Sequence, residues 1–192
     1  MSKPDQELIA DCLNGQTHAF GDLVVRYQNR LYNTLVGVLG SVDDAHDVAQ
    51  EAFVNAFQKL HTFRGHSAFY SWLFRIALNS AVSRQRKVNR VPVSIEAVRE
   101  RSGIEPIDRR PASRPEHALE TTERQTAVRS ALAELAEEFR TALVLKEMEN
   151  LSYQEIAEIV GCPVGTVRSR IHRARSELRE KLQDLLREPC DT

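Results

Sequence analysis

Two stretches of the 192-residue sequence carry several basic side chains and no acid. The first contains Arg84, Arg86, Lys87 and Arg90, and the second contains Arg168, Arg170, Arg173 and Arg175. Four acids lie instead between Asp43 and Glu51, although the formal net charge of the whole chain is only −1. Charges of opposite sign on separate segments predict separate partners, one of them polyanionic. Each basic run taken alone also fits a solvated helix face.

The residues around the second basic run have the spacing of a helix-turn-helix. Ser152 and Glu155 form a capping-box pattern at the start of a short helix. Ala157, Gly161 and Val167 then supply a small residue, a tight turn and a β-branched plug at the junction with the next helix. That next helix has an inward apolar stripe of Val164, Val167, Ile171, Ala174, Leu178 and Leu182. Its outward face contains Thr166, Arg168, Ser169, Arg170, His172, Arg173 and Arg175.

Arginine forks on such a face suit guanine edges and phosphates in a major groove. The turn spacing, the cap and the acid-free basic face together predict binding to duplex DNA. The alternative is an ordinary helical hairpin with a charged outer face.

The first basic run follows a helix with more apolar surface than a bundle helix needs. Its core stripe contains Phe69, Trp72, Leu73, Ile76 and Ala77, and a second stripe contains Tyr70, Phe74 and Leu78. Aromatic rings that lead into a basic end suit single-stranded nucleic acid, because bases stack on rings and arginines hold phosphates. The alternative is that Tyr70 and Phe74 belong to the core.

The elements that position these residues are all expected to be helices, so the predicted fold class is all-α. Apolar residues recur at steps of three and four through the first 86 residues or so. A short helix is expected over 5–13, followed by a long helix that ends at Gly40-Ser41. Caps at Ser41 and Ser67 should begin the next two long helices, separated by a turn at Arg64-Gly65.

The helix begun by Ser41 should bury one face and expose the other. Val48, Phe53 and Phe57 are expected in the core. Asp47, Gln50 and Glu51 are expected to face outwards.

Composition divides the chain into two small helical domains joined by a flexible linker. Four prolines and six arginines lie between Val88 and Pro115 without a sustained apolar period. The predicted domains are therefore 1–87 and 116–188, with a linker over 88–115 that has room for a short helix around 95–101.

Several function classes have no support in the sequence. Cys12, Cys162 and Cys190 form no CxxC pair, and the six histidines form no HExxH pattern, so we expect neither a disulfide framework nor a bound metal or cofactor. No nucleophile–base pair or phosphate-binding glycine loop predicts catalysis. No apolar run reaches the length of a membrane span, and the acids near the N-terminus argue against a signal peptide. A cytoplasmic location without membrane insertion is expected.

Three segments together resemble the sigma-70 family of RNA polymerase sigma factors, in its extracytoplasmic-function (ECF) group. They read DAHDVAQEAFVNAF, FRGHSAFYSWLFRIALNSA and LSYQEIAEIVGCPVGTVRSRIHRAR, in that order, and the likeness is greatest to RpoE-like stress factors. The resemblance implies a non-enzymatic initiation factor whose partners are core RNA polymerase, promoter DNA and an anti-sigma factor.

The resemblance also implies roles by position. Docking on the clamp helices of the polymerase β′ subunit falls to Asp44, Asp47, Gln50 and Glu51. Reading of the melted −10 strand falls to Arg64, Gly65, Ser67, Phe69, Trp72, Arg75, Asn79 and Arg84. Reading of the −35 duplex falls to Thr166, Arg168, Ser169, Arg170, His172 and Arg173, although His172 stands where relatives often carry Phe.

Two other functions stay open on the residues alone. One is a stand-alone helix-turn-helix regulator whose N-terminal bundle senses a ligand or partner. The other is an RNA-binding adaptor that depends on the basic end at Arg84 to Arg90. Binding of the isolated chain to promoter duplex distinguishes the first from a sigma factor, which needs core polymerase.

Overall fold

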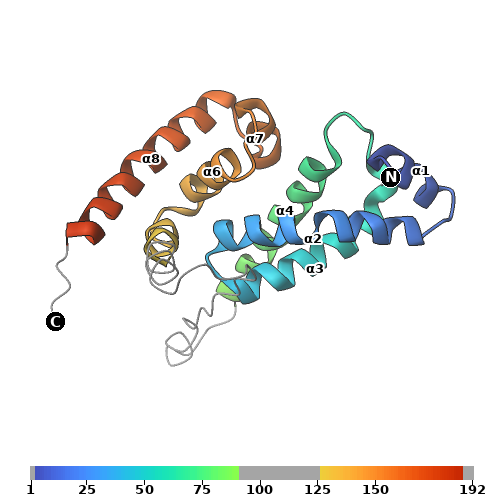
Figure 1. The fold of residues 1–192 in the computed structure, drawn as a ribbon, viewed down its shortest axis with the longest axis horizontal. Coiled ribbons are helices and arrows are strands. Elements are labelled where there is room, and N and C mark those ends of the chain that lie inside the picture. Colours follow the sequence, from blue (N-terminus) through green and yellow to red (C-terminus); the bar gives the residue numbers. More distant parts are fainter. Residues whose placement is uncertain (1–2, 91–125, 188–192) are drawn as a thin grey trace, which may run out of the picture.

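The computed structural model describes residues 3–90 and 126–187, and all regular elements within these ranges are helices (Figure 1). The all-α prediction is therefore confirmed. The N-terminal half contains α1 (Asp5–Leu13), α2 (His18–Leu39), α3 (Val42–Lys59), a 3-10 turn (Leu60–Thr62) and α4 (Phe69–Arg90). The C-terminal half contains a helical stretch over 126–133, then α6 (Glu137–Glu147), α7 (Tyr153–Val160) and α8 (Val164–Arg187). The predicted linker and its short helix lie outside the described residues, except that 88–90 continue α4.

Sequence signals at the helix ends explain the boundary between α2 and α3. Gly40 ends α2 in the left-handed conformation with φ 71°, which costs glycine little because it has no Cβ. Ser41 then caps α3, its side chain accepting a hydrogen bond from the Asp44 N–H at 3.2 Å. Helices α2, α3 and α4 pack around a core that includes Leu35 of α2 and Ala52 of α3, both fully buried.

Two predictions in this half are wrong. Phe57 is 43 % exposed, whereas Val48 is buried as expected and Phe53 is half-buried. Each step of four residues advances about 40° beyond a full helical turn, so the series through Phe53 to Phe57 drifts off the buried stripe. Ser67 does not cap α4, because the helix begins at Phe69 and Ala68 provides the first accepting carbonyl, to Trp72 N at 3.3 Å.

The C-terminal half has the predicted helix-turn-helix. Ser152 and Glu155 form a complete capping box at the start of α7, and Gly161 ends this helix with φ 69°. Val167 is fully buried at the junction of α7 and α8, next to Ile171 on the same inward stripe. Helix α6 packs against both α7 and α8 and completes this half.

The two halves pack directly against each other. Helix α2 lies along α6, and α4 lies against α7 (Figure 1). One cluster of buried apolar residues runs through both halves and includes Leu73 of α4 and Ile156 of α7. Tyr70 and Phe74 are 3 % and 0 % exposed, so the second aromatic stripe belongs to the core.

Candidate nucleic-acid interface

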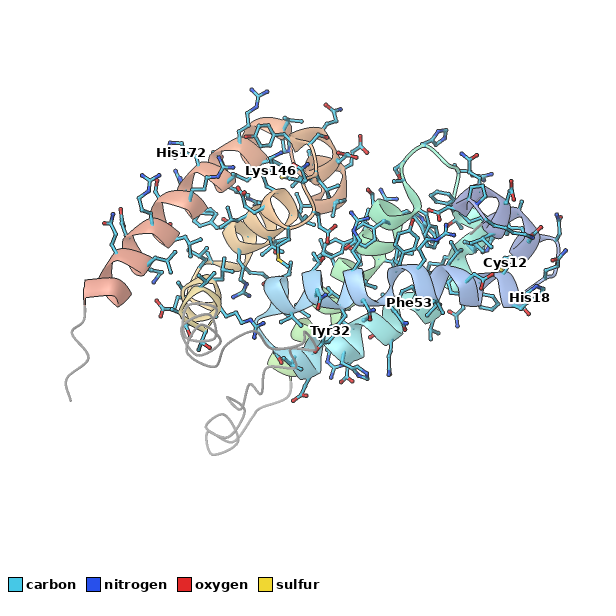
Figure 2. All side chains as sticks on the ribbon, in the orientation of Figure 1. Cys12, His18, Tyr32, Phe53, Lys146 and His172 are labelled. Atoms are coloured by element: carbon cyan, nitrogen blue, oxygen red, sulfur yellow. The ribbon has the colours of Figure 1, made fainter. Side chains whose placement is uncertain are left out.

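Helix α8 presents a polar and basic face to solvent. Arg168, Ser169, His172 and Arg173 are exposed, as the helical period predicts, and Figure 2 shows His172 on the outer side of α8. Thr166 is half-buried. Burial of Val167 and Ile171 against α7 and α6 fixes which side of the helix faces outwards.

Part of this face forms a basic groove of about 410 Å³ between α7 and α8. Two cations lie near the ring of Tyr153, with Lys146 Nζ 5.4 Å and Arg168 Cζ 5.7 Å from its centroid. The groove is lined by Tyr153, Arg168, Ile171, His172, Arg175, Ser176 and Arg179. A groove with this charge can receive a phosphate backbone.

The predicted −35 residues omit Tyr153, Arg175 and Arg179, which also line this groove, although Arg175 was expected on the outward basic face of the helix. Arg179 follows Arg175 by four positions and so lies on the same side of α8, a signal that the sequence contains. Tyr153 gives no such signal, because only the packing of α7 on α8 brings its ring beside Arg168.

Arg170 differs from the other arginines of this face. Its side chain is only 23 % exposed, and its Nη2 donates to the Glu138 carboxylate of α6 at 2.9 Å. Its Nη1 also lies 3.7 Å from the Cys162 sulfur in the turn. In this conformation Arg170 therefore connects α6, the turn and α8.

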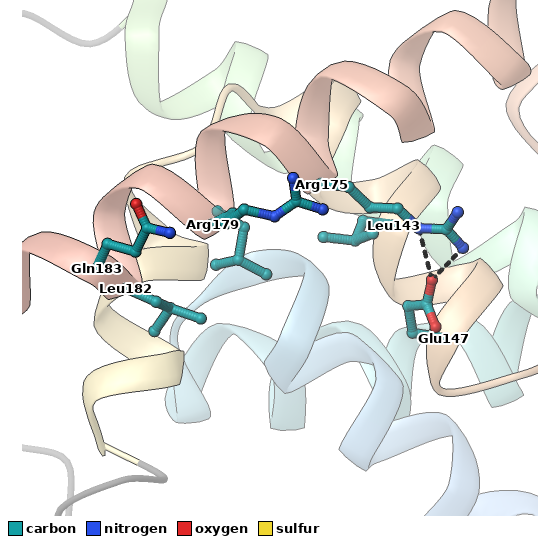
Figure 3. Close-up of a pocket in the computed structure, with 7 residues that line it drawn as sticks. Leu143, Glu147, Arg175, Arg179, Leu182 and Gln183 are labelled. Carbon is teal, nitrogen blue, oxygen red and sulfur yellow. Dashed lines mark hydrogen bonds and ion pairs between the residues drawn. The ribbon is translucent and has the colours of Figure 1, made fainter. Parts of the chain in front are cut away.

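A second groove lies between α6 and the C-terminal part of α8, with a volume of about 390 Å³ (Figure 3). Leu143, Leu178 and Leu182 give it an apolar surface. At one end Arg175 donates two hydrogen bonds to the Glu147 carboxylate, at 2.6 and 3.1 Å.

The residues expected to read single-stranded DNA divide into exposed and buried groups. Arg64, Gly65, Arg75 and Asn79 are exposed, and Ser67 is half-buried. Gly65 has φ 71°, which the turn in the 64–68 loop requires.

Phe69 and Trp72 are 2 % and 7 % exposed beneath this loop. Their rings form a cluster with Phe63, with centroids 5.3 to 5.8 Å apart. Direct stacking of a base on either ring would require the cluster to open. The arrangement found here uses both rings to support the loop.

The acidic face of α3 is exposed at all four expected positions, Asp44, Asp47, Gln50 and Glu51. Arg84 of α4 lies against this face, with Nη2 2.6 Å from Asp47 and Nε 3.8 Å from Asp44. The structure thus brings an arginine expected to hold DNA together with two acids expected to bind protein.

Within residues 3–90 and 126–187, no group of three or more His, Cys, Asp or Glu side chains could hold a metal ion. No helix in these ranges is long and apolar enough to cross a membrane.

Comparisons with known proteins identify the family. Residues 23–91 match Sigma-70 region 2, and residues 125–178 match Sigma-70, region 4. The chain belongs to the sigma-70 family of RNA polymerase sigma factors. The RNA polymerase sigma-H factor of Pseudomonas aeruginosa is 42 % identical over 188 residues, covering 96 % of both chains. The ECF RNA polymerase sigma-E factor of Escherichia coli K12 is 40 % identical over 185 residues, covering 95 % of this chain and 96 % of that protein.

Solved structures support the same assignment. The sigma factor RpoE of Bartonella quintana, in complex with the anti-sigma factor NepR, is 27 % identical with a TM-score of 0.71, covering 86 % of this chain and 98 % of that chain. CnrH, in complex with the cytosolic domain of CnrY, is 29 % identical with a TM-score of 0.66, covering 94 % of this chain and 97 % of that chain. The chain is a transcription initiation factor of the ECF group that binds core RNA polymerase and directs it to −35 and −10 promoter elements. The alternative of a stand-alone regulator is not favoured.

Proposed function

We propose that polymerase, the −10 strand and the −35 duplex are bound by three separate surfaces of the chain. The acidic face of α3 docks on the clamp helices of the polymerase β′ subunit. The 64–68 loop and the exposed side of α4 hold the melted −10 strand, and the outward face of α8 reads the −35 duplex. The observation that carries this proposal is that acidic and basic side chains occupy different exposed helix faces, α3 and α8.

Within the −35 surface, solvent exposure distinguishes the side chains that contact DNA from those that hold α8 in place. Arg168 and Arg173 are exposed, so their side chains can reach base edges, whereas Arg170 is held by Glu138. We assign Arg168, Arg173, Ser169 and His172 to the duplex, with Thr166 at the edge of the face. Arg170 contributes indirectly, by holding α8 in position through its bond to Glu138. Tyr153, Arg175 and Arg179 line the groove that receives the phosphates.

Within the −10 surface, Asn79 and Arg75 are the exposed polar groups of α4 closest in sequence to the loop. They hold unstacked bases and phosphates together with Arg64, Gly65 and Ser67. Phe69 and Trp72 position the loop from below. Arg84 reaches DNA only after it leaves Asp47.

The partners and domain limits follow the same assignment. We keep the domains at 1–87 and 116–188 with a linker between them, except that α4 continues three residues past the first boundary, to Arg90. An anti-sigma factor binds this chain in the cytoplasm, as the complexes of RpoE and CnrH suggest.

The test compares Arg168→Ala with Asn79→Ala in reconstituted holoenzyme. Loss of a bidentate arginine contact removes about 1–3 kcal/mol of discrimination, so Arg168→Ala should relax selection at one position of the −35 element. Asn79→Ala should leave −35 selection unchanged and reduce permanganate reactivity of the −10 region, because its contacts form only after the duplex opens.

Matched controls remove the same groups elsewhere. Arg129→Ala changes an exposed residue of the helical stretch over 126–133, and Asn33→Ala changes an exposed residue of α2. Both should behave like the parent chain. If Arg168→Ala and Asn79→Ala alter the same promoter element, or neither alters any, the proposed division is wrong.

A further inference from the structure

The first helix of the chain is fixed to the second by a partly buried carboxylate. Asp5, the first residue of α1, has 26 % of its side chain exposed and forms an ion pair with Arg26 of α2. The Tyr27 hydroxyl donates to the other oxygen of the same carboxylate. Burial, and then the hydrogen bond to Asp5, raise the pKa of Tyr27 to about 12, so the phenol keeps its proton and remains a donor at neutral pH. Asp5 therefore bonds to two neighbouring residues of α2 at once.

The ring of Tyr27 packs against the start of α4. Its centroid lies 5.6 Å from that of Phe69, and the two rings are tilted towards each other. Phe69 belongs to the ring cluster beneath the 64–68 loop, with its centroid 5.8 Å from that of Phe63 and 5.7 Å from that of Trp72. A continuous path of side-chain contacts thus leads from the carboxylate on α1 to the aromatic rings under the loop.

Helix α1 also contacts the segment that leads into the loop. It packs on α2 and on the 3-10 turn Leu60–Thr62 (Figure 1). Leu8 and Ile9 of α1 and Leu60 of the turn are buried in the same core cluster. Helix α1 therefore supports the loop at both of its ends, through the turn before it and through Tyr27 at the helix after it.

The loop depends on this support because its own backbone contributes little. Within residues 3–90 and 126–187, no hydrogen bond between backbone groups involves residues 64–67. Arg64, Gly65 and His66 are exposed, so the loop buries little surface of its own. A segment with few buried contacts and no backbone hydrogen bonds changes conformation at a low cost in free energy. The rings beneath the loop therefore determine which conformation it presents to DNA.

We propose that Asp5 and Tyr27 are positioning residues for promoter opening, because they fix the aromatic cluster that holds the 64–68 loop in the conformation that binds the −10 strand. This inference rests on the proposed assignment of the −10 surface to the loop and α4. Asp5 acts through Tyr27 and Phe69 and does not touch DNA. When its contacts are lost, the loop occupies other conformations, and the affinity for the melted strand falls with the fraction of chains that remain competent.

The first test uses the fluorescence of Trp72, the only tryptophan of the chain, as a report on the cluster. Asp5→Ala and Tyr27→Phe should each increase the quenching of this fluorescence by acrylamide, because a looser cluster admits the quencher to a ring that is 7 % exposed. Tyr27→Phe keeps the ring and removes only the hydroxyl, so it tests the bond even if Asp5→Ala frays α1. Glu7→Ala removes an exposed carboxylate from the same turn of α1 and should leave the quenching unchanged.

The second test measures promoter opening in holoenzyme reconstituted with core polymerase. Asp5→Ala should lower the yield of permanganate-reactive open complexes about 10-fold, because loss of a charge-assisted hydrogen bond shifts such an equilibrium by about that factor. Asp5→Asn keeps an oxygen acceptor for the Tyr27 hydroxyl and should recover part of this loss. Adding Tyr27→Phe to Asp5→Ala should cost little more, since the bond is already absent. In all these variants, as in Glu7→Ala, the Kd for core polymerase and the selection of the −35 element should stay at the parent values.

The fluorescence and opening measurements can each refute the role of Asp5. Unchanged Trp72 quenching in both Asp5→Ala and Tyr27→Phe would overturn the inference, and so would an equal loss of polymerase binding, −35 selection and opening, which indicates a residue that only stabilises the fold. If quenching changes but opening does not, while Asn79→Ala does reduce opening, α1 does not position the −10 loop. If Asn79→Ala has no effect either, the −10 surface is wrongly assigned and the inference falls with it, whereas the quenching still shows whether α1 orders the cluster.

Discussion

Replacing Ser152 with alanine should loosen the start of the DNA-binding motif. The Ser152 Oγ accepts a hydrogen bond from Glu155 N at 3.2 Å and donates to Glu155 Oε2 at 2.7 Å. Glu155 Oε2 also accepts from Ser152 N at 2.9 Å. Helix α7 has only eight residues, and the N–H groups of its first turn have no partner within the helix. The capping box therefore matters more to this helix than it would to a long one. Fraying of the first turn would also move Tyr153 away from Arg168.

The magnitude follows from the bonds that are lost. Removing an N-cap serine costs about 0.5–2 kcal/mol. For a chain of this length, about 1 kcal/mol lowers the midpoint of thermal unfolding by about 2–4 °C. Ser152→Thr retains the hydroxyl and should melt close to the parent. Thermal melts followed by far-UV circular dichroism measure both variants.

The pH dependence gives an independent check. Hydrogen bonds from the Ser152 side chain and backbone hold the pKa of Glu155 below its ordinary value. A carboxylate with a lowered folded-state pKa adds stability above its unfolded pKa and loses this contribution as the pH falls through the folded value. The Ser152→Ala penalty should therefore be larger at pH 7 than at pH 3. Equal melting of the alanine and threonine variants, or a penalty that grows at pH 3, would refute the capping argument.

Two further predictions concern the same motif. Val167→Ala should lower the free energy of unfolding by about 2–3 kcal/mol, because it loses buried apolar surface and leaves a cavity. Val25→Ala, at a position 70 % exposed, should leave the stability nearly unchanged. Equal midpoints of urea unfolding for the two variants would contradict the role of Val167 as the plug between α7 and α8. Gly161→Ala should destabilise by about 1–2 kcal/mol because alanine is strained at φ 69°. Gly165→Ala within α8 should instead stabilise by up to about 1 kcal/mol, so shifts of the same sign in thermal melts would exclude the conformational explanation.

The helix-turn-helix was predicted closely because local sequence signals mark both the ends of its helices and the side that is buried. The Ser152 cap, the left-handed Gly161 and the stripe through Val167 each constrain the same two helices. The start of α4 was less predictable, because capping preference favours Ser67 over the Ala68 that precedes the helix. Only the packing of the Phe63, Phe69 and Trp72 rings beneath the loop distinguishes them.

The types of residue in the candidate site were predictable from the sequence, but the ion pairs that these residues form between helices were not. Helical spacing correctly placed Arg168, His172 and Arg173 on the exposed face of α8. Nothing in the local pattern indicated that Arg170 would bond to Glu138, 32 positions earlier, or that Arg84 would lie against Asp47. Ion pairs between helices depend on tertiary packing, which helical periodicity does not specify.

The second apolar stripe of α4 contributes to the core that the two halves share. Small domains bury a limited fraction of their surface, so a C-terminal half of about 60 described residues gains stability by sharing a core. Tyr70 contributes to that shared core from the N-terminal half, and Met148 approaches Gly37 from the other. Separation of the halves would expose both of these surfaces to water. The shared core therefore stabilises each half more than its own buried residues could.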